Sequence, residues 1–141
     1  MTWVELDNLV RIGKLKREPA TASEIQGLIR SGELRLADAE KQFLSLESRF
    51  DLAYNGAHAL ALAALRRLGY RSDNRYLVFQ VLPHTLGVPA EIWRVLAKGH
   101  EARNRAEYEG ELDVDDRLVT DMIQSARDVQ RAIHVVGPEP D

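Results

Sequence analysis

Apolar residues in the first half of the chain recur at alternating steps of four and three, the spacing of a helix that packs along a seam. From residue 21 onward the series consists of Ile25, Ile29, Gly32, Leu36, Ala39, Phe43 and Leu46. Thr21 with Glu24, and Ser23 with Gln26, have the spacing of a capping box at a helix start. The pattern therefore predicts one long helix from about residue 21 to the end of this series.

A second series with the same spacing follows at once. It consists of Phe50, Tyr54, Ala57, Ala61, Ala64 and Leu68. Gly69 then provides a C-terminal stop, and a connection near Glu47–Arg49 would join the two helices as an antiparallel hairpin. Gly32 on the first seam costs about 1 kcal/mol of helix propensity but lets another helix approach closely. The alanines of the second seam indicate the same close packing.

Three further helices are expected in the second half. A short one covers about Arg75 to Leu86, with Pro83 kinking or ending it. A longer one follows Pro89, runs from about Ala90 to Tyr108 and stops at Gly110. Aspartates at 113, 115 and 116 start a final helix, whose apolar face carries Val114, Leu118, Met122, Ala126, Val129 and Ile133. No strand pattern is present, so the expected class is all-α: a helical bundle of four main helices with one short additional helix.

Composition sets the domain organisation and excludes several classes. The 141 residues, 45% hydrophobic and 29% charged, suit one globular domain at 21–135, with an irregular N-terminal arm at 1–20 and a flexible tail at 136–141. Absent cysteine excludes disulfides and thiolate metal sites, and neither a signal peptide nor an apolar run of membrane-spanning length is visible. We therefore expect a cytoplasmic protein with no membrane association, cofactor or metal. The net charge of −3 means that any nucleic-acid contact depends on a local basic patch.

Arg103 occupies a position that the helix pattern reserves for an apolar residue. The seam of the 90–108 helix runs through Ile92, Leu96, Gly99, Arg103 and Ala106. Arginine rarely goes inside a protein unpaired. Arg103 either pairs with Glu107 four residues on, or lies where the helix end leaves the core, or joins Asn104 and Tyr108 in a polar cluster.

Three segments together resemble the HEPN superfamily. They are Arg49-Phe50-Asp51-Leu52-Ala53-Tyr54-Asn55, Gly69-Tyr70-Arg71 and Arg103-Asn104-Arg105-Ala106-Glu107-Tyr108. The resemblance extends from about residue 15 to 133. Within the superfamily, the chain is similar in particular to small prokaryotic HEPN-domain proteins of unassigned function. It implies a helical bundle that dimerises, and a place in a toxin–antitoxin or defence-type system beside a nucleotidyltransferase-like antitoxin. Many members are metal-independent ribonucleases with an arginine, commonly followed by a polar residue such as asparagine, and with a histidine separated from the arginine by four to six intervening positions.

The chain departs from that motif at the position where the motif has its histidine. Four positions intervene between Arg103 and Tyr108, so a tyrosine stands where the histidine is expected. Tyrosine has an ordinary pKa near 10 and is a poor base at neutral pH, although it can donate a hydrogen bond. His100, three residues before Arg103, is the candidate replacement, in reversed order. The expected function is therefore a domain with a degenerate ribonuclease motif that binds RNA or an antitoxin. The alternatives are an active ribonuclease that uses Arg103, Asn104 and Tyr108, and a purely structural dimerisation module.

Two groups of basic residues are candidates for nucleic-acid binding. Arg71 and Arg75 follow the hairpin, close to Arg66 and Arg67, where cations also stabilise a helix C-terminus. A second group, Arg94, Lys98 and Arg105, forms a stripe on the Arg103 helix that together with Arg103 would follow a phosphate backbone, or is simply a solvated face. His58 and His84 lack the spacing of a metal site and are interpreted as structural.

Overall fold

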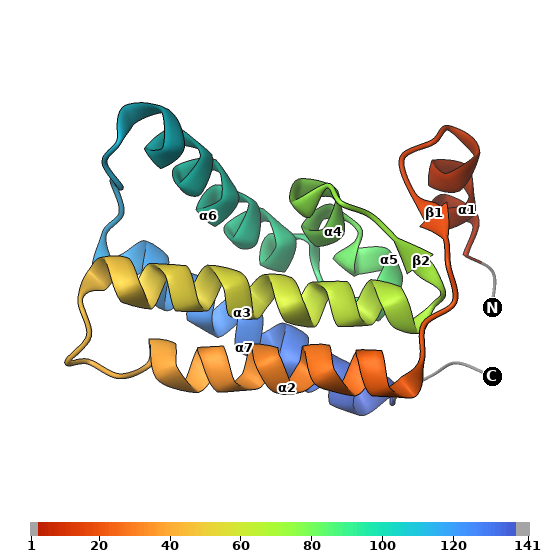
Figure 1. Cartoon of the computed structure of the whole chain (residues 1–141), viewed down its shortest axis with the longest axis horizontal. Helices are drawn as coiled ribbons and strands as arrows, with labels where there is room; N and C mark the ends of the chain where they lie inside the picture. The colour runs from red at the N-terminus through yellow and green to blue at the C-terminus, as the bar shows by residue number, and fades with distance from the viewer. Residues whose placement is uncertain (1–2, 138–141) are drawn as a thin grey trace.

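A computed structural model describes residues 3–137, and within them helices dominate (Figure 1). The four long helices are α2 (Ala22–Ala39), α3 (Leu46–Arg67), α6 (Ala90–Glu109) and α7 (Asp116–Val136). The short ones are α1 (Val4–Arg11), α4 (Arg75–Gln80) and α5 (Leu82–Leu86). The all-α class and the four main helices are therefore confirmed, whereas the single short additional helix is wrong because residues 3–137 contain three short helices.

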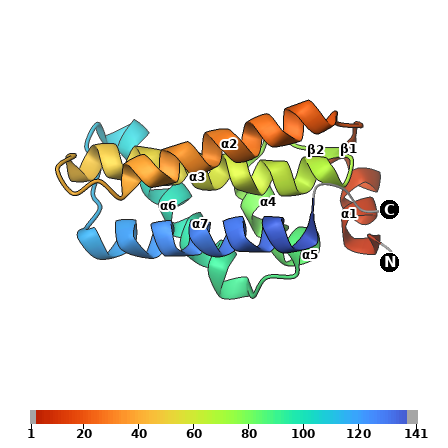
Figure 2. The ribbon, with the colours of Figure 1, turned by 90° about the horizontal axis from the view of Figure 1, so that it is seen from below.

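Helix α3 lies at the centre of the bundle because the core positions predicted for it are buried. Phe50, Tyr54, Ala57, Ala61 and Ala64 are each at most 1% exposed. Helix α2 packs antiparallel to α3, and α7 runs along the other side of this pair (Figures 1 and 2). Helices α4, α5 and α6 cover the remaining side of α3, and α6 diverges from it towards its own C-terminus (Figure 1).

The close approach predicted at Gly32 is confirmed. A Cβ atom added there would lie 2.6 Å from Cγ of Leu60 and 2.9 Å from the carbonyl oxygen of Gly56. Helices α2 and α3 therefore pack backbone against backbone at this point, which no larger residue permits without a shift.

The first predicted helix is wrong at its C-terminal end. Helix α2 stops at Ala39, Phe43 is 83% exposed in the connection, and Leu46 begins α3. The reversal occurs here because the Ser45 side chain accepts a hydrogen bond from the Ser48 backbone and caps α3. In addition, Nε of the buried Arg49 donates to the Ala39 carbonyl at the end of α2 (2.8 Å). The seam spacing continued across the turn by coincidence.

The N-terminal arm also differs from its prediction. Residues 4–11 form α1, whose Leu6 is fully buried, and Lys16–Arg17 (β1) pairs antiparallel with Tyr70–Arg71 (β2). The predicted absence of strands is thus wrong for this two-residue pair. Both features exist because the arm packs on the bundle, and Tyr70 Oη donates to Asp7 of α1 at 2.5 Å.

The helix starts and stops of the second half are close to the predictions. The predicted 75–86 helix divides at Val81 into α4 and α5, and Pro83 lies in the first turn of α5. Gly110 ends α6 with a φ of 73°, in the left-handed conformation that favours glycine, and Asp115 caps α7. Most of the predicted tail, residues 138–141, lies outside the described residues.

Candidate functional site: a cationic cluster around Tyr54

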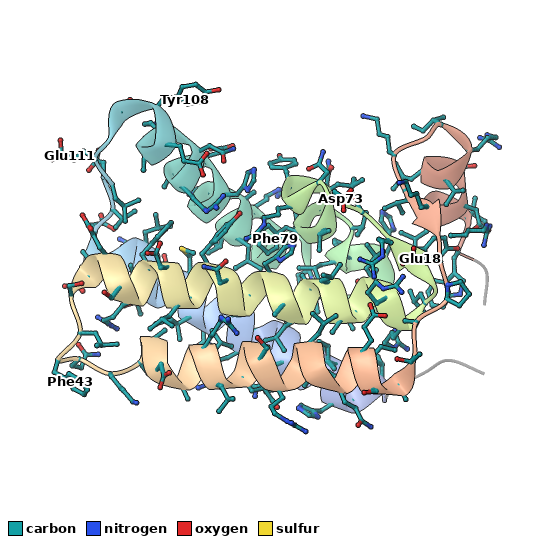
Figure 3. All side chains as sticks on the ribbon, in the orientation of Figure 1. Glu18, Phe43, Asp73, Phe79, Tyr108 and Glu111 are labelled. Atoms are coloured by element: carbon teal, nitrogen blue, oxygen red, sulfur yellow. The ribbon has the colours of Figure 1, made fainter. Side chains whose placement is uncertain are left out.

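Helices α3, α4 and α6 bring a set of polar side chains together around the ring of Tyr54, and we call this set the Tyr54 cluster (Figure 3 shows the side chains of these helices). It consists of Tyr54, Asn55, Arg75, His100, Arg103 and Asn104. Tyr54 is only 1% exposed, whereas Asn104 lies at the surface. The cluster therefore has a buried floor and an open side.

His100 is held between Tyr54 and Asn104. Its Nδ1 lies 2.9 Å from Tyr54 Oη, and its Nε2 lies 3.1 Å from Nδ2 of Asn104. An amide nitrogen only donates, so Nε2 accepts from Asn104 and Nδ1–H donates to the tyrosine. The ring also stacks on Tyr54, with centroids 6.1 Å apart. Tyr54 thus fixes the ring orientation, and the basic nitrogen of His100 faces the open side.

Two guanidinium groups lie at the same aromatic ring. Cζ of Arg103 is 5.2 Å from the Tyr54 centroid, and Cζ of Arg75 is 5.5 Å from it. Both contacts are in the range of cation–π interactions. Arg75 Nη1 also donates to Oδ1 of Asn55 (3.1 Å). Arg75 and Arg103 come from helices α4 and α6, so the fold places cations from two helices at one aromatic ring.

The positive charge of the cluster has little carboxylate compensation within the described residues. Arg103 pairs with Glu107 at 3.4 Å, but Glu107 is 62% exposed. Burial, followed by the charges of Arg103 and Arg75, lowers the pKa of His100. His100 is therefore neutral at neutral pH, and its Nε2 accepts a hydrogen bond from Asn104 instead of carrying a proton.

His58 lies beside the cluster, and the positive charges of the cluster also act on its ring. Its ring meets Phe79 edge to face at 6.0 Å. Burial, followed by the charges of Arg75, His100 and Arg103, lowers the pKa of His58 to about 4.

This lowered pKa makes folding stability depend on pH. Between pH 6.5 and 4 the unfolded chain binds a proton at His58 that the folded chain does not, so stability falls as pH falls through this window. From pH 7 to pH 5 the loss due to His58 should be about 2 kcal/mol. Urea unfolding of wild type and His58→Gln at both pH values measures it. The variant should lose about 2 kcal/mol less than wild type; equal losses would contradict the lowered pKa.

The structure separates the predicted motif residues. The ion pair of Arg103 with Glu107 is confirmed, and Arg103 in addition joins the Tyr54 cluster with its side chain 37% exposed. Asn104 contacts His100. Tyr108 is 93% exposed and points away from the helices at the end of α6 (Figure 3). The prediction that Tyr108 joins Arg103 and Asn104 in one polar cluster is therefore wrong within a single chain.

The basic stripe on α6 does not include Arg103. Residues two apart on a helix point to nearly opposite sides, and Arg105 is exposed while Arg103 faces Tyr54. Arg94 and Lys98 are exposed on the Arg105 side. Lys98 also lines a hollow that contains Asp113, Asp115 and Asp121, so acidic groups surround this part of the stripe. A phosphate backbone following both the stripe and Arg103 is excluded by this geometry.

The two arginines after the hairpin have different surroundings. Arg71 pairs with Glu18 and Glu24, which raises its pKa, the hydrogen bond to Glu18 being the main cause. Arg75 belongs to the Tyr54 cluster. Of this pair, Arg75 is the one available to a ligand.

Sequence reasoning missed Tyr54 and Asn55 as site residues, and it placed Arg75 in a separate basic group with Arg71. A usable signal was the tyrosine itself, because it occupies a core position between Phe50 and Ala57. A buried tyrosine hydroxyl needs a polar partner. Such a partner had to come from another helix, and the sequence does not show which helix lies opposite.

Comparisons with known proteins add no assignment. The chain matches no family model, and comparison with curated proteins and with solved structures gave no match. Among residues 3–137, no helix is long and apolar enough to span a membrane, and no group of three His, Cys, Asp or Glu side chains is placed to hold a metal ion.

Proposed function

We propose that the protein is an HEPN-like RNA-binding domain that holds an RNA phosphate at the Tyr54 cluster. The observation that carries the proposal is the convergence of Arg75 and Arg103 on the Tyr54 ring beside His100. Two positive charges at one buried ring favour an anionic ligand, and a phosphate that contacts either guanidinium group would offset part of this charge. The open side of the cluster, at Asn104, gives a ligand access.

The resemblance to HEPN proteins directs the proposal towards RNA rather than a free anion. Arg103 and Asn104 are the matching motif residues, and both belong to the cluster. Arginine suits phosphate because its planar fork donates two parallel hydrogen bonds. Asn55 and Asn104 offer amides for contacts to ribose or base.

An active ribonuclease is the second candidate, favoured by the position of His100 beside Arg103. Nε2 of His100 would take the proton of a ribose 2′-hydroxyl in place of the Asn104 contact. The 2′-oxygen would attack the adjacent phosphorus while Arg75 and Arg103 stabilise the phosphorane charge. The bond to the 5′-oxygen breaks, and that oxygen takes a proton from solvent. The products would be a 2′,3′-cyclic phosphate and a 5′-hydroxyl end. Tyr108 has no part in this version.

RNA binding by Arg103→Ala tests the proposal, with Arg105→Ala as a matched control from the opposite side of the same helix. Fluorescence anisotropy with a labelled octauridylate should show affinity at least about tenfold weaker for Arg103→Ala, because losing a phosphate contact costs more than about 1.4 kcal/mol. Arg105→Ala should bind like wild type. Equal affinities for both variants would contradict the proposal.

The same samples, analysed for cleavage products, decide between binding and catalysis. Wild-type cleavage that His100→Gln abolishes, without loss of binding, would establish the ribonuclease. If instead Arg103→Ala lowers dimer stability and leaves RNA binding unchanged, the structural dimerisation module is the correct alternative.

The homodimer and the nucleotidyltransferase-like antitoxin remain predictions. Tyr108 and Asn104 are exposed on the diverging end of α6, where a second copy would reach them.

A further inference from the structure

A basic hollow lies beside the Tyr54 cluster, between the N-terminal arm and α4. Its volume is about 570 Å³, within the range of small-molecule sites. The arm contributes Lys14 and Lys16, and the α4 side contributes Asn74 and Tyr76. Figure 3 marks Asp73, which lines the hollow at the start of α4.

The two lysines are the available charges of this hollow. Both are exposed, and neither takes part in an ion pair within residues 3–137. Arg71 also lines the hollow, but Glu18 and Glu24 bind it. Asp73 is the acidic lining residue, so two lysines outweigh one aspartate.

Tyr76 is shared between the hollow and the Tyr54 cluster. It lines the hollow, and its ring meets His100 edge to face at 5.9 Å. On another side it meets Trp93, again edge to face, at 6.0 Å. The side chains of Tyr76 and Trp93 are half-buried. Tyr76 therefore borders both the hollow and the Tyr54 cluster.

We propose that this hollow binds the part of an RNA strand next to the phosphate held at the Tyr54 cluster, so that the ligand is a single-stranded oligonucleotide. This rests on the proposed function. Lys14 and Lys16 would contact backbone phosphates, and the Tyr76 ring would stack on an unpaired base. Aromatic rings beside a basic groove are the usual means of binding single strands, whereas the bases of a duplex are not free to stack on them.

Oligouridylates of increasing length test this inference. Wild type, Arg103→Ala and the double variant Lys14→Ala/Lys16→Ala are compared, with Arg94→Ala/Lys98→Ala as a control of equal charge change on α6. For an octamer the arm variant should bind about tenfold more weakly than wild type. The plot of log affinity against log salt concentration should be less steep for the arm variant than for wild type. The difference in slope should be about 1.4, which corresponds to the loss of two phosphate contacts on a single strand. For a dinucleotide, too short to fill both sites, the arm variant should match wild type.

The outcomes distinguish the two proposals. If wild type binds no oligonucleotide, the proposed function fails. If Arg103→Ala weakens binding but the arm variant equals wild type at every length, the hollow is not part of the site and only this inference fails. A duplex that binds as tightly as the octamer would also overturn it. So would oligoglutamate binding with the same affinity and lysine dependence, because the partner would then be an acidic protein segment. Unchanged circular dichroism of the arm variant ensures that weaker binding is not due to unfolding.

Discussion

Replacing Arg66 with alanine should lower the free energy of unfolding by about 3–5 kcal/mol, the range for breaking a buried charged network. Arg66 is 1% exposed, and its Nε donates to Glu24 at 2.7 Å. Its Nη1 and Nη2 atoms also donate to the carbonyl oxygens of Glu18, Pro19 and Tyr70. One guanidinium thus joins α2, α3, β2 and the arm. Its loss removes the Arg66 donor from these carbonyl oxygens, and the Glu24 carboxylate keeps its contact with Arg71.

Arg71→Ala is the matched control, because the carboxylates of Glu18 and Glu24 pair with both Arg66 and Arg71. Its side chain is 36% exposed, so solvent screens the pairs and the expected loss is about 0–1 kcal/mol. Urea unfolding followed by circular dichroism measures both. Similar losses for Arg66→Ala and Arg71→Ala would contradict the structural role assigned to the buried network.

Two glycine-to-alanine substitutions in α2 should have opposite effects. Gly32→Ala places its Cβ 2.9 Å from the Gly56 carbonyl oxygen and 2.6 Å from Cγ of Leu60. Backbone cannot move aside cheaply, so a net loss of about 1–3 kcal/mol is expected, despite better helix propensity. Gly27→Ala meets nothing within 4 Å and should gain up to about 1 kcal/mol.

Thermal and urea unfolding of both variants test this contact. A gain in stability for Gly32→Ala, equal to that of Gly27→Ala, would show that α2 and α3 do not approach each other as closely as described.

The helices were predictable where packing and local signals agree. Tyr54 and Ala61 lie on the predicted seam of α3, and both are buried. Gly69 and Gly110 end helices in the left-handed conformation, which the sequence signals by the residue type itself.

The end of α2 was not predictable from its spacing. Phe43 continues the seam pattern, yet it is exposed in a turn. Apolar spacing records distances along the chain and contains no information on where the chain reverses. The Ser45 cap was the only local signal, and it is weaker than an uninterrupted apolar series. The prediction of an irregular N-terminal arm was wrong for a related reason. Helix α1 and strand β1 depend on contacts with Tyr70, which is over 50 positions away in the sequence.

The candidate site was predicted in part and missed at its centre, Tyr54. Arg103 was recognisable as a charge on an apolar seam, and His100 as its neighbour. Their convergence with Tyr54 and Arg75 depends on how α3, α4 and α6 cross, which only the three-dimensional structure gives. Tyr108 was favoured by its position in the motif, but on the helix surface it points into solvent.

The most direct test of phosphate binding at the Tyr54 cluster is the imidazole NMR spectrum of His100, recorded as a function of pH with and without octauridylate. A bound phosphate favours the charged ring, so the pKa of His100 should rise on RNA binding by about one unit or more, and the ring signals should shift. Arg103→Ala should remove most of this response. Binding of RNA with an unchanged His100 titration would place the RNA elsewhere and contradict the proposal.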